Sequence, residues 1–320
     1  MLTLFIDRVV KRSYTMLIAA LLCLPATTMF AEEGHEHAHG DILLTINEEG
    51  ELATGSIANQ SNVLQLDEQH VYEVELDDPG VFGLEQAFSG SEPGLAGADV
   101  GVDIGTHSYL PGNAALSFEL QSFEAGGVSS NLLFWDFSSH DPTTVDEDDV
   151  NFQSVNAGHT VTLSDISNSS ISATVDGSDT DVSGFTIGST NALGGMHEDL
   201  LFTAAGSGGG EPDPGIYLWA MEFEIDGLHS EIVYMLGMTV GVDFSSNPPF
   251  DYSNFDQTDS EELEEAFESM MGAAEHWVDE TFAGGSHDHG NAVPEPSTLA
   301  MTLMGLMATL ACVRRRQRNR

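Results

Sequence analysis

Five of the twelve histidines lie, together with an acidic residue, in two short stretches, one near each end of the chain. The first reads His35-Glu36-His37-Ala38-His39 and the second reads His287-Asp288-His289. Imidazole beside carboxylate suits Zn²⁺, Ni²⁺ or Cu²⁺, and alternate residues of an extended chain point to the same side and can reach one ion. The spacing therefore predicts chelation through His35, His37, His39, His287 and His289, with one shared ion if the two ends of the body meet.

Catalytic motifs are weak or missing by comparison. His35-Glu36-x-x-His39 matches the zincin pattern, but that motif works on a helix, and Gly34 and Gly40 on either side predict none. The sequence contains no Gly-x-Ser-x-Gly elbow and no Ser-x-x-Lys motif, and a glycosidase carboxylate pair would be hidden among so many acids. We therefore expect a protein that is not an enzyme.

His197 is the best internal ligand candidate, because it stands in a Gly-Gly-Met-His-Glu-Asp turn at the start of a predicted strand. His70, His107 and His229 are the next candidates. The alternative for each is an ordinary hydrogen-bonded histidine of the surface or core.

Two acidic loops, 141–149 and 176–181, could hold Ca²⁺, which takes six to eight oxygen ligands. Neither loop has the Asp-x-Asp-x-Asp-Gly spacing of a calcium loop, so a solvated acidic loop is the favoured interpretation.

The charge of the chain is divided sharply along the sequence. All eight Lys and Arg residues lie within 1–31 or 293–320, whereas all but two of the 52 acidic residues lie between these segments. The body therefore has no Lys or Arg to pair with its carboxylates, and solvent, salt, histidine or bound cations must relieve the repulsion. This excludes nucleic acid and anionic lipid surfaces as partners. Solubility in a saline habitat is an equally good explanation of the acidity.

Both ends of the chain read as targeting segments. Residues 1–31 contain a basic start, an apolar centre and a cleavage site after Ala31, as in a secretory signal peptide. The C-terminus contains Pro294-Glu295-Pro296, an apolar run over 299–313 and an arginine cluster from Arg314. At about 1.5 Å per residue this run spans about 22 Å, short of a ~30 Å hydrocarbon core, which predicts a thin or temporary span of the inner membrane. Cys23 and Cys312 both lie in these segments, so the mature chain has no disulfide or thiolate ligand.

The tail resembles the PEP-CTERM sorting signal of Gram-negative bacteria in its Pro294-Glu295-Pro296 motif, its span and its arginines. This resemblance implies processing by a membrane enzyme of the exosortase type, with the product on the outer surface or in the extracellular matrix. An ordinary tail anchor is the alternative.

Short segments with alternating or β-branched residues, bounded by Gly, Pro, Asn and Asp, fill the body and predict an all-β fold, an antiparallel β-sandwich with one C-terminal amphipathic helix. The predicted strands are 42–46, 52–57, 70–76, 99–104, 115–123, 131–137, 159–163, 170–175, 184–187, 199–203, 216–225 and 232–244. The hairpin over 217–242, which turns at Asp226-Gly227, should be the central pair.

The predicted helix begins with a Thr258-x-x-Glu261 capping box, and an apolar stripe from Leu263 to Val278 recurs at three- and four-residue spacing. We interpret it as a cap or stalk whose Met and aromatic residues make core contacts. The resulting organisation is a signal peptide (1–31), a His-rich arm (32–40), a β-sandwich (41–257), the helix (258–283), a His-containing linker (284–292) and the sorting segment (293–320).

The body also is similar to a PEP-CTERM family repressed by the zinc-uptake regulator and to histidine-rich choice-of-anchor surface proteins. The likeness rests on the His-rich entry before Asp41, the 68–73 segment, the Gly194–Glu198 turn and the Gly215–Leu218 strand. It implies a β-sandwich surface protein with a part in zinc capture. We therefore predict a surface protein that binds Zn²⁺ or a similar ion, as a scavenger or an accessory to a zinc uptake system. The alternative is a structural matrix or biofilm protein that associates with exopolysaccharide.

Overall fold

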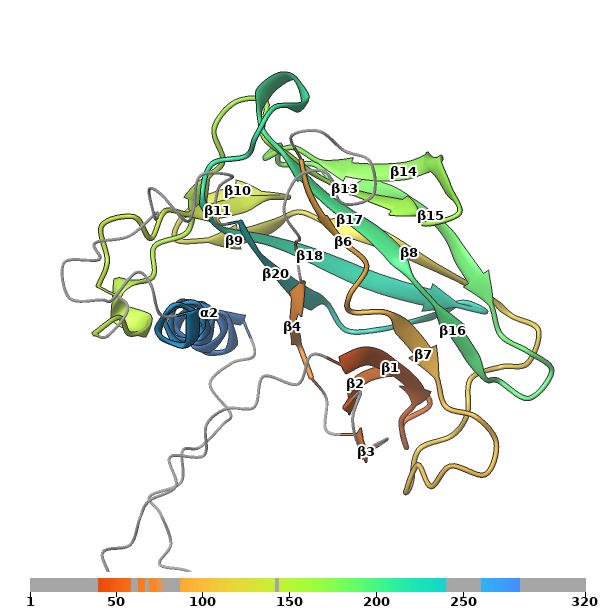
Figure 1. The fold of residues 1–320 in the computed structure, drawn as a ribbon. Coiled ribbons are helices and arrows are strands. Elements are labelled where there is room, and N and C mark those ends of the chain that lie inside the picture. The colour runs from red at the N-terminus through yellow and green to blue at the C-terminus, as the bar shows by residue number, and fades with distance from the viewer. Residues whose placement is uncertain are drawn as a thin grey trace, which may run out of the picture. The chain divides into compact units, whose positions relative to one another are not determined.

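The computed structural model describes residues 40–58, 63–66, 69–74, 76, 87–141, 144–239 and 260–282. The signal peptide, the histidines of the arm, Thr258 of the capping box, the linker and the sorting segment lie outside these residues. Within them the protein is an all-β, sandwich-like fold with one helix, α2 (Ser260–Phe282) (Figure 1). No helix of this part of the chain is long and apolar enough to cross a membrane.

Among the described residues the strands form four sheets (Figure 1). The largest contains β4 (Val71–Val74), β8 (Ala115–Gln121), β11 (Leu133–Trp135), β12 (Gln153–Ser154), β15 (Val182–Ser189), β18 (Gly215–Ile225), β19 (Leu228–His229) and β20 (Val233–Thr239). In the second sheet the strands lie in the order β16 (Met196–Glu198), β7 (Leu95–Gly97), β1 (Gly40–Ile46), β2 (Leu52–Ala58) and β3 (Val63–Gln65). In the third sheet the order is β14 (Asn168–Val175), β13 (Thr160–Asp165), β17 (Leu200–Ala205) and β6 (Phe88–Gly90). In the fourth, β9 (Phe123–Ala125) pairs with β10 (Val128–Ser130).

The predicted central hairpin is confirmed. β18 pairs with β20 from Gly215↔Thr239 to Met221↔Val233, and the turn after β18 has positive φ at both Asp226 and Gly227. That conformation matches the turn to the twist of the strands and suits an Asp-Gly pair. The continuous apolar run of the hairpin strands is explained by burial on both faces of the sheet.

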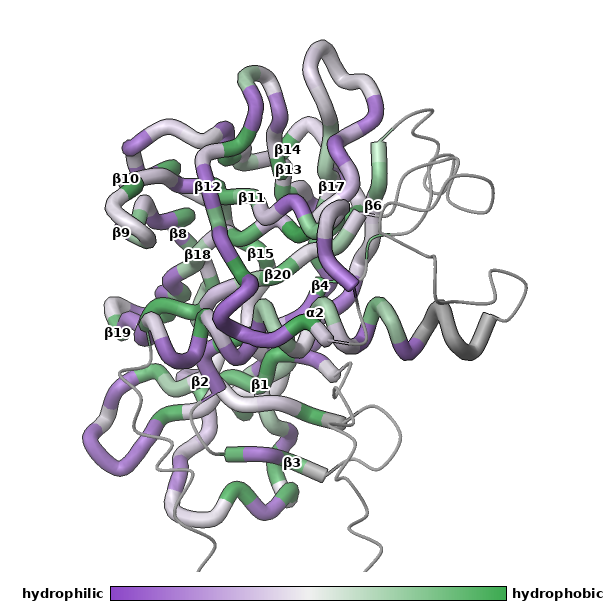
Figure 2. The backbone as a smooth tube through the Cα atoms, turned by 90° about the vertical axis from the view of Figure 1, so that its left-hand side faces the viewer, coloured by the Kyte–Doolittle hydropathy of each residue, from purple (hydrophilic) through white to green (hydrophobic). Residues whose placement is uncertain are grey.

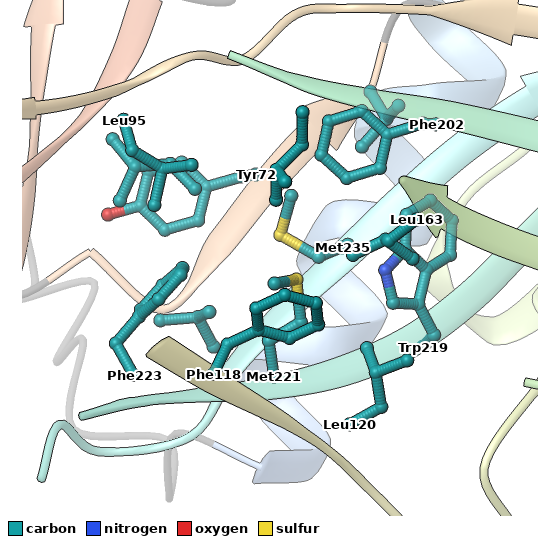
Figure 3. Packing of buried hydrophobic residues seen from close by; sticks show 14 of the residues in the cluster. Tyr72, Leu95, Phe118, Leu120, Leu163, Phe202, Trp219, Met221, Phe223 and Met235 are labelled. Atoms are coloured by element: carbon teal, nitrogen blue, oxygen red, sulfur yellow. The ribbon is translucent and has the colours of Figure 1, made fainter. Parts of the chain in front are cut away.

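Alternate residues of β18 point into two different cores. Tyr217, Trp219 and Phe223 join a cluster with Leu163 and Phe202 of the facing sheet, and Figure 3 shows Trp219, Met221 and Met235 packed between the sheets in this cluster. The intervening Ile216, Leu218 and Ala220 face the second cluster, on the side of the helix. In Figure 2 the apolar positions follow the strands, whereas many connecting loops are hydrophilic.

Helix α2 covers the second face of the large sheet. Its buried residues are Ala266, Met270, Met271, Ala273, Ala274 and Val278, and Phe267, Trp277 and Phe282 pack beside them. The Phe282 ring stacks on Tyr234 of β20 at a centroid distance of 4.3 Å. The prediction of a cap with a Met and aromatic stripe in core contact is therefore confirmed.

Two expectations about the sheets need correction. The sheets are not purely antiparallel, because β1 pairs with β7 and β4 pairs with β20 in parallel. The predicted strand over 99–104 is wrong: Val100 and Val102 are exposed, and the Val102 amide donates to the Asp99 carbonyl at 3.1 Å in a turn whose Gly101 has φ +102°. Nearby, β7 is a strand that the sequence reading missed.

Candidate metal-binding site

Several histidine rings of the body lie beside carboxylates. Of the seven histidines that the structure describes, five have a carboxylate oxygen within 4.0 Å. These pairs are His70–Glu231, His159–Asp213, His197–Asp41, His229–Glu222 and His276–Glu147. The body has no Lys or Arg that could lie beside these carboxylates instead.

His197 lies in β16, directly opposite Ala96 of β7, and Ala96 lies opposite Leu43 of β1. Asp41 is two residues before Leu43, on the same face of the sheet, because side chains alternate along a strand. The strand order therefore brings together an imidazole and a carboxylate that are 156 residues apart. His197 Nε2 lies 3.0 Å from Asp41 Oδ2.

The two side chains differ in exposure. The His197 side chain is 60% exposed, whereas that of Asp41 is only 17% exposed. A carboxylate that accepts a hydrogen bond from Nε2–H leaves the Nδ1 lone pair of the ring free, which is the arrangement of a metal ligand held by an outer carboxylate. The predicted ligand His197 is thus placed in a geometry compatible with metal binding.

A second carboxylate converges on this place. A Cβ added to Gly94 would lie 2.8 Å from Oδ1 of both Asp41 and Asp199. The Gly94 carbonyl also accepts the amide of Ile42 at 2.8 Å, which fixes the strand beside the pair. Gly94 is therefore needed here because it leaves space for both carboxylates.

The described residues do not complete a metal site by themselves. Across these parts of the chain no group of three or more His, Cys, Asp or Glu side chains is arranged to hold an ion. His35, His37, His39, His287 and His289, which the sequence also predicts as ligands, lie outside the described residues, as do Pro294, Glu295 and Pro296 of the sorting motif.

The other internal candidates divide into two kinds. His107 Nδ1 lies 2.8 Å from the Thr45 hydroxyl, as in an ordinary hydrogen-bonded histidine. His229 Nδ1 lies 2.9 Å from Glu222 Oε1, and His70 Nδ1 lies 3.8 Å from Glu231 Oε2. The His229 ring is therefore oriented by an acid, as His197 is, whereas the His70 contact is too long for a hydrogen bond.

In both acidic loops, carboxylates accept hydrogen bonds from nearby backbone amides. Hydrogen bonds from Ser178 lower the pKa of Asp176, and hydrogen bonds from Ser122 to Asp181, first from its backbone amide, lower the pKa of that carboxyl. Asp146 caps a short 3₁₀ turn, η1 (Glu147–Asp149). These bonds give both loops a structural role, and Ca²⁺ binding there stays a prediction.

Sequence reasoning found His197 but missed Asp41, Asp199 and Gly94. One signal was present, since Asp41 directly follows the His-rich stretch and its Gly40. The partnership itself depends on the β1–β7–β16 order, and no local pattern encodes that order.

Comparison with known proteins identifies the C-terminus. Residues 292–317 match the PEP-CTERM protein-sorting motif. The search of curated proteins and the search of solved structures each found no match for the chain. The motif marks an exported, surface-sorted protein that an exosortase-type enzyme processes, as the resemblance of the tail predicted.

Proposed function

We propose that this exported protein binds Zn²⁺ or a similar divalent transition metal at the cell surface, through the N-terminal histidines and the His197–Asp41 pair. The observation that carries the proposal is the 3.0 Å contact between His197 Nε2 and Asp41 Oδ2, two residues beyond His39. The function that follows is zinc scavenging, or delivery to an uptake system.

The covalent chain supports one shared ion. The Cα atoms of His39 and Asp41 are at most about 7 Å apart, and those of His37 and Asp41 at most about 14 Å apart. Zinc takes four ligands at about 2.0–2.3 Å, and the described residues supply fewer than that number. We therefore assign the remaining ligands of the proposed site to the histidines of the arm.

Charge supports a cation at this place. Asp41 and Asp199 converge beside Gly94, Asp41 contacts His197, and the body contains no Lys or Arg to neutralise the two acids. Carboxylate alone would favour Mg²⁺ or Ca²⁺, but imidazole shifts the preference to Zn²⁺, Cu²⁺ or Ni²⁺. An ordered ligand such as His197 lowers the entropic cost of forming a chelate.

Zinc titration by calorimetry tests the proposal. His35, His37 and His39 replaced together by Ala should weaken binding, and His197→Ala should weaken the same binding event. His140→Ala is the matched control, because its ring packs against Trp135 outside this site. Wild-type protein that binds no zinc at micromolar metal would refute the proposal and leave the structural matrix function standing.

We also propose the route to the surface. The chain passes through the inner membrane of a Gram-negative cell by way of 299–313, and an exosortase-type enzyme then removes the tail after the Pro294-Glu295-Pro296 motif. Mass spectrometry of the surface protein should find no peptide from Arg314–Arg320. An intact arginine cluster on the mature product would refute this route.

A further inference from the structure

Two buried hydroxyl groups converge on the carbonyl of Asp213, at the peptide bond that joins this residue to Pro214. Asp213 lies in the connection between β17 and β18, two residues before β18 begins at Gly215. Its carbonyl oxygen accepts a hydrogen bond from the Tyr217 hydroxyl at 3.1 Å and another from the Thr239 hydroxyl at 2.8 Å. Two donors on one carbonyl oxygen stabilise the negative charge that the oxygen gains when a nucleophile adds to its carbon.

Both donors are held in place by the large sheet. Tyr217 of β18 and Thr239 of β20 are fully buried, and the two strands pair at Gly215↔Thr239 and Tyr217↔Gly237. Burial, and then the charge of Asp213, raises the pKa of Tyr217, so its hydroxyl keeps its proton and stays a donor. The two hydroxyls therefore form a preorganised pair that needs no rearrangement as charge develops on the oxygen.

The side-chain carboxyl group of Asp213 is held beside the same peptide bond. Its Oδ2 atom accepts the side-chain amide of Asn156 and lies 3.6 Å from His159 Nδ1. His159 is buried, and the same nitrogen lies 3.3 Å from the Tyr217 hydroxyl oxygen. Both contacts of the carboxyl group are made by Oδ2, so Oδ1 is the atom that can attack the carbonyl carbon of its own residue.

The chemistry of an aspartate before a proline suits such an attack. Addition of Oδ1 to the carbonyl carbon of the same residue closes a five-membered ring, and a nucleophile held this close to its target has an effective concentration of about 10⁵–10⁸ M. The leaving nitrogen of Pro214 becomes a basic secondary amine once it is protonated. An imidazole beside the carboxyl group, as His159 is here, can hold that proton close to the reacting atoms.

We propose that the folded chain cleaves its own Asp213–Pro214 bond in mild acid. Oδ1 of Asp213 adds to the carbonyl carbon, and the oxyanion that forms accepts hydrogen bonds from Tyr217 and Thr239. The nitrogen of Pro214 takes up the proton held by the Asp213–His159 pair, the bond between carbon and nitrogen breaks, and a cyclic anhydride remains on Asp213. Water then opens the anhydride, which it can reach because the Asp213 side chain is 43% exposed. The net reaction is hydrolysis of one peptide bond, once for each chain.

Cleavage at this bond leaves the body assembled. β18 follows the bond in the chain, but it pairs with β8 and β11, which precede the bond. Its side chains are also buried in both hydrophobic clusters. The product is therefore two chains in one fold, and the C-terminal chain carries α2 and the sorting segment. The covalent link between most of the body and the sorted C-terminus is lost, and strand pairing replaces it.

Acid should speed the cut. The titratable side chains beside the carboxyl group are His159 and Tyr217, and Glu211 lies two residues earlier in the same connection. Because Tyr217 keeps its proton, the rate follows the proton on the Asp213–His159 pair and should rise by up to about tenfold for each pH unit of acidification. His159→Gln should displace this pH profile, which a change of packing alone would not do.

The sequence supplies internal controls, because Asp–Pro bonds also occur at 78–79 and 141–142. The full chain, purified in detergent, is incubated at pH 8 and at pH 5, and its products are separated in denaturant and identified by mass spectrometry. At pH 5 the folded chain should yield fragments that end at Asp213 and begin at Pro214, about 100-fold or more faster than it is cut at the other two bonds. The same chain unfolded in guanidinium chloride should lose this preference.

Matched variants test the two hydroxyl donors. Asp213→Ala should abolish the cut, and Tyr217→Phe should slow it by about 10²–10³-fold, as the loss of one oxyanion donor does. Tyr72→Phe is the control, because the Tyr72 hydroxyl belongs to the same buried cluster and donates at 2.8 Å to a different carbonyl, that of Gly55. Thermal melting of each variant verifies folding.

A second matched pair keeps the test open if Tyr217→Phe misfolds. Thr239→Val removes the other donor and should slow the cut by a similar factor. Thr54→Val is its control, since the Thr54 hydroxyl is also buried and donates at 2.8 Å to the Gln69 carbonyl.

Three results would overturn self-cleavage. Equal rates at the three Asp–Pro bonds of the folded chain would show the ordinary acid lability of these bonds. Equal rates in Tyr217→Phe and Tyr72→Phe would show that the hydroxyls only anchor the connection before β18. A folded chain that yields no fragment ending at Asp213, under conditions that cut the unfolded chain, would show that the fold protects this bond.

Discussion

Replacing Gly94 by Ala is the sharpest structural test of the His197 site. The new Cβ would lie 2.8 Å from Oδ1 of both Asp41 and Asp199, whereas ordinary contacts begin at 3.4 Å. Each carboxylate oxygen must therefore retreat by about 0.6 Å, because carbon and oxygen atoms at the shorter distance repel each other. A shift of that size away from His197 lengthens its 3.0 Å contact to about 3.6 Å, which is no longer a hydrogen bond.

The loss of this orienting contact sets the size of the effect. Outer partners of a metal-bound histidine contribute about 10- to 100-fold in metal affinity, so zinc binding at this site should weaken by that factor. The stability cost should be near the low end of the ~1–3 kcal/mol typical of overpacking, because carboxylate ends can move. For a domain of this size ~1 kcal/mol lowers the melting temperature by about 2–4 °C.

Gly127→Ala is the matched control for this variant. Gly127 has φ +82° and nothing within 4 Å of an added Cβ, so alanine there costs a similar ~1 kcal/mol through backbone strain alone. It lies in the turn between β9 and β10, in a different sheet. Calorimetry and melting curves of the two variants should show equal losses of stability but a loss of zinc affinity only in Gly94→Ala. Wild-type zinc affinity in Gly94→Ala, or equal weakening in both, would refute the geometric reasoning.

Three further predictions concern stability. Met270→Ala removes a fully buried side chain of α2 and should lower the free energy of unfolding, measured in urea, by about 2–5 kcal/mol. The exposed Glu268→Ala should lower it by less than about 0.5 kcal/mol. Equal effects would contradict the packing of the helix. Burial raises the pKa of Tyr72 and Tyr217, and it raises that of Tyr234 to about 12. The pKa values of these tyrosines in the folded protein exceed the value of about 10 in the unfolded chain. The free energy of unfolding should therefore stay constant up to pH ~10 and fall above it by up to about 1.4 kcal/mol per pH unit for each tyrosine. A free energy of unfolding that does not fall between pH 10 and 11.5 would be inconsistent with this burial. Because the acidic body has no Lys or Arg, its melting temperature should rise from low to molar salt, and a flat profile would argue against unrelieved charge repulsion.

The sequence best predicted those elements in which the order of apolar and polar residues reflects which side chains are buried. The hairpin over 217–242 was predicted as the central pair, and β18 and β20 are buried at the centre of the large sheet. The apolar stripe predicted from Leu263 to Val278 lies on the buried face of α2 from Ala266 to Val278. The Asp226-Gly227 turn was equally clear, because few residue pairs suit its φ values. In each case local sequence and tertiary structure agree.

The predictions that failed concern features that depend on pairing between strands far apart in the sequence. Residues 99–104 alternate like a strand, yet a turn at Gly101 leaves their valines exposed. The short β7 carries little pattern, although it joins β1 to β16 and thereby brings Asp41 to His197. Such a site is determined by strand order, so the sequence could name its histidine but not its carboxylates.

A double-mutant cycle measures the central claim, that the N-terminal histidines and His197 share one zinc ion. Zinc affinity of the N-terminal site is measured for the wild type, for His197→Ala, for the variant with His35, His37 and His39 replaced by Ala, and for the combination. Ligands of one ion are coupled, so the combined loss should fall short of the sum of the two single losses by about 0.5–3 kcal/mol. Losses that add within about 0.3–0.5 kcal/mol would show that His197 and the arm act independently, and would contradict the shared site.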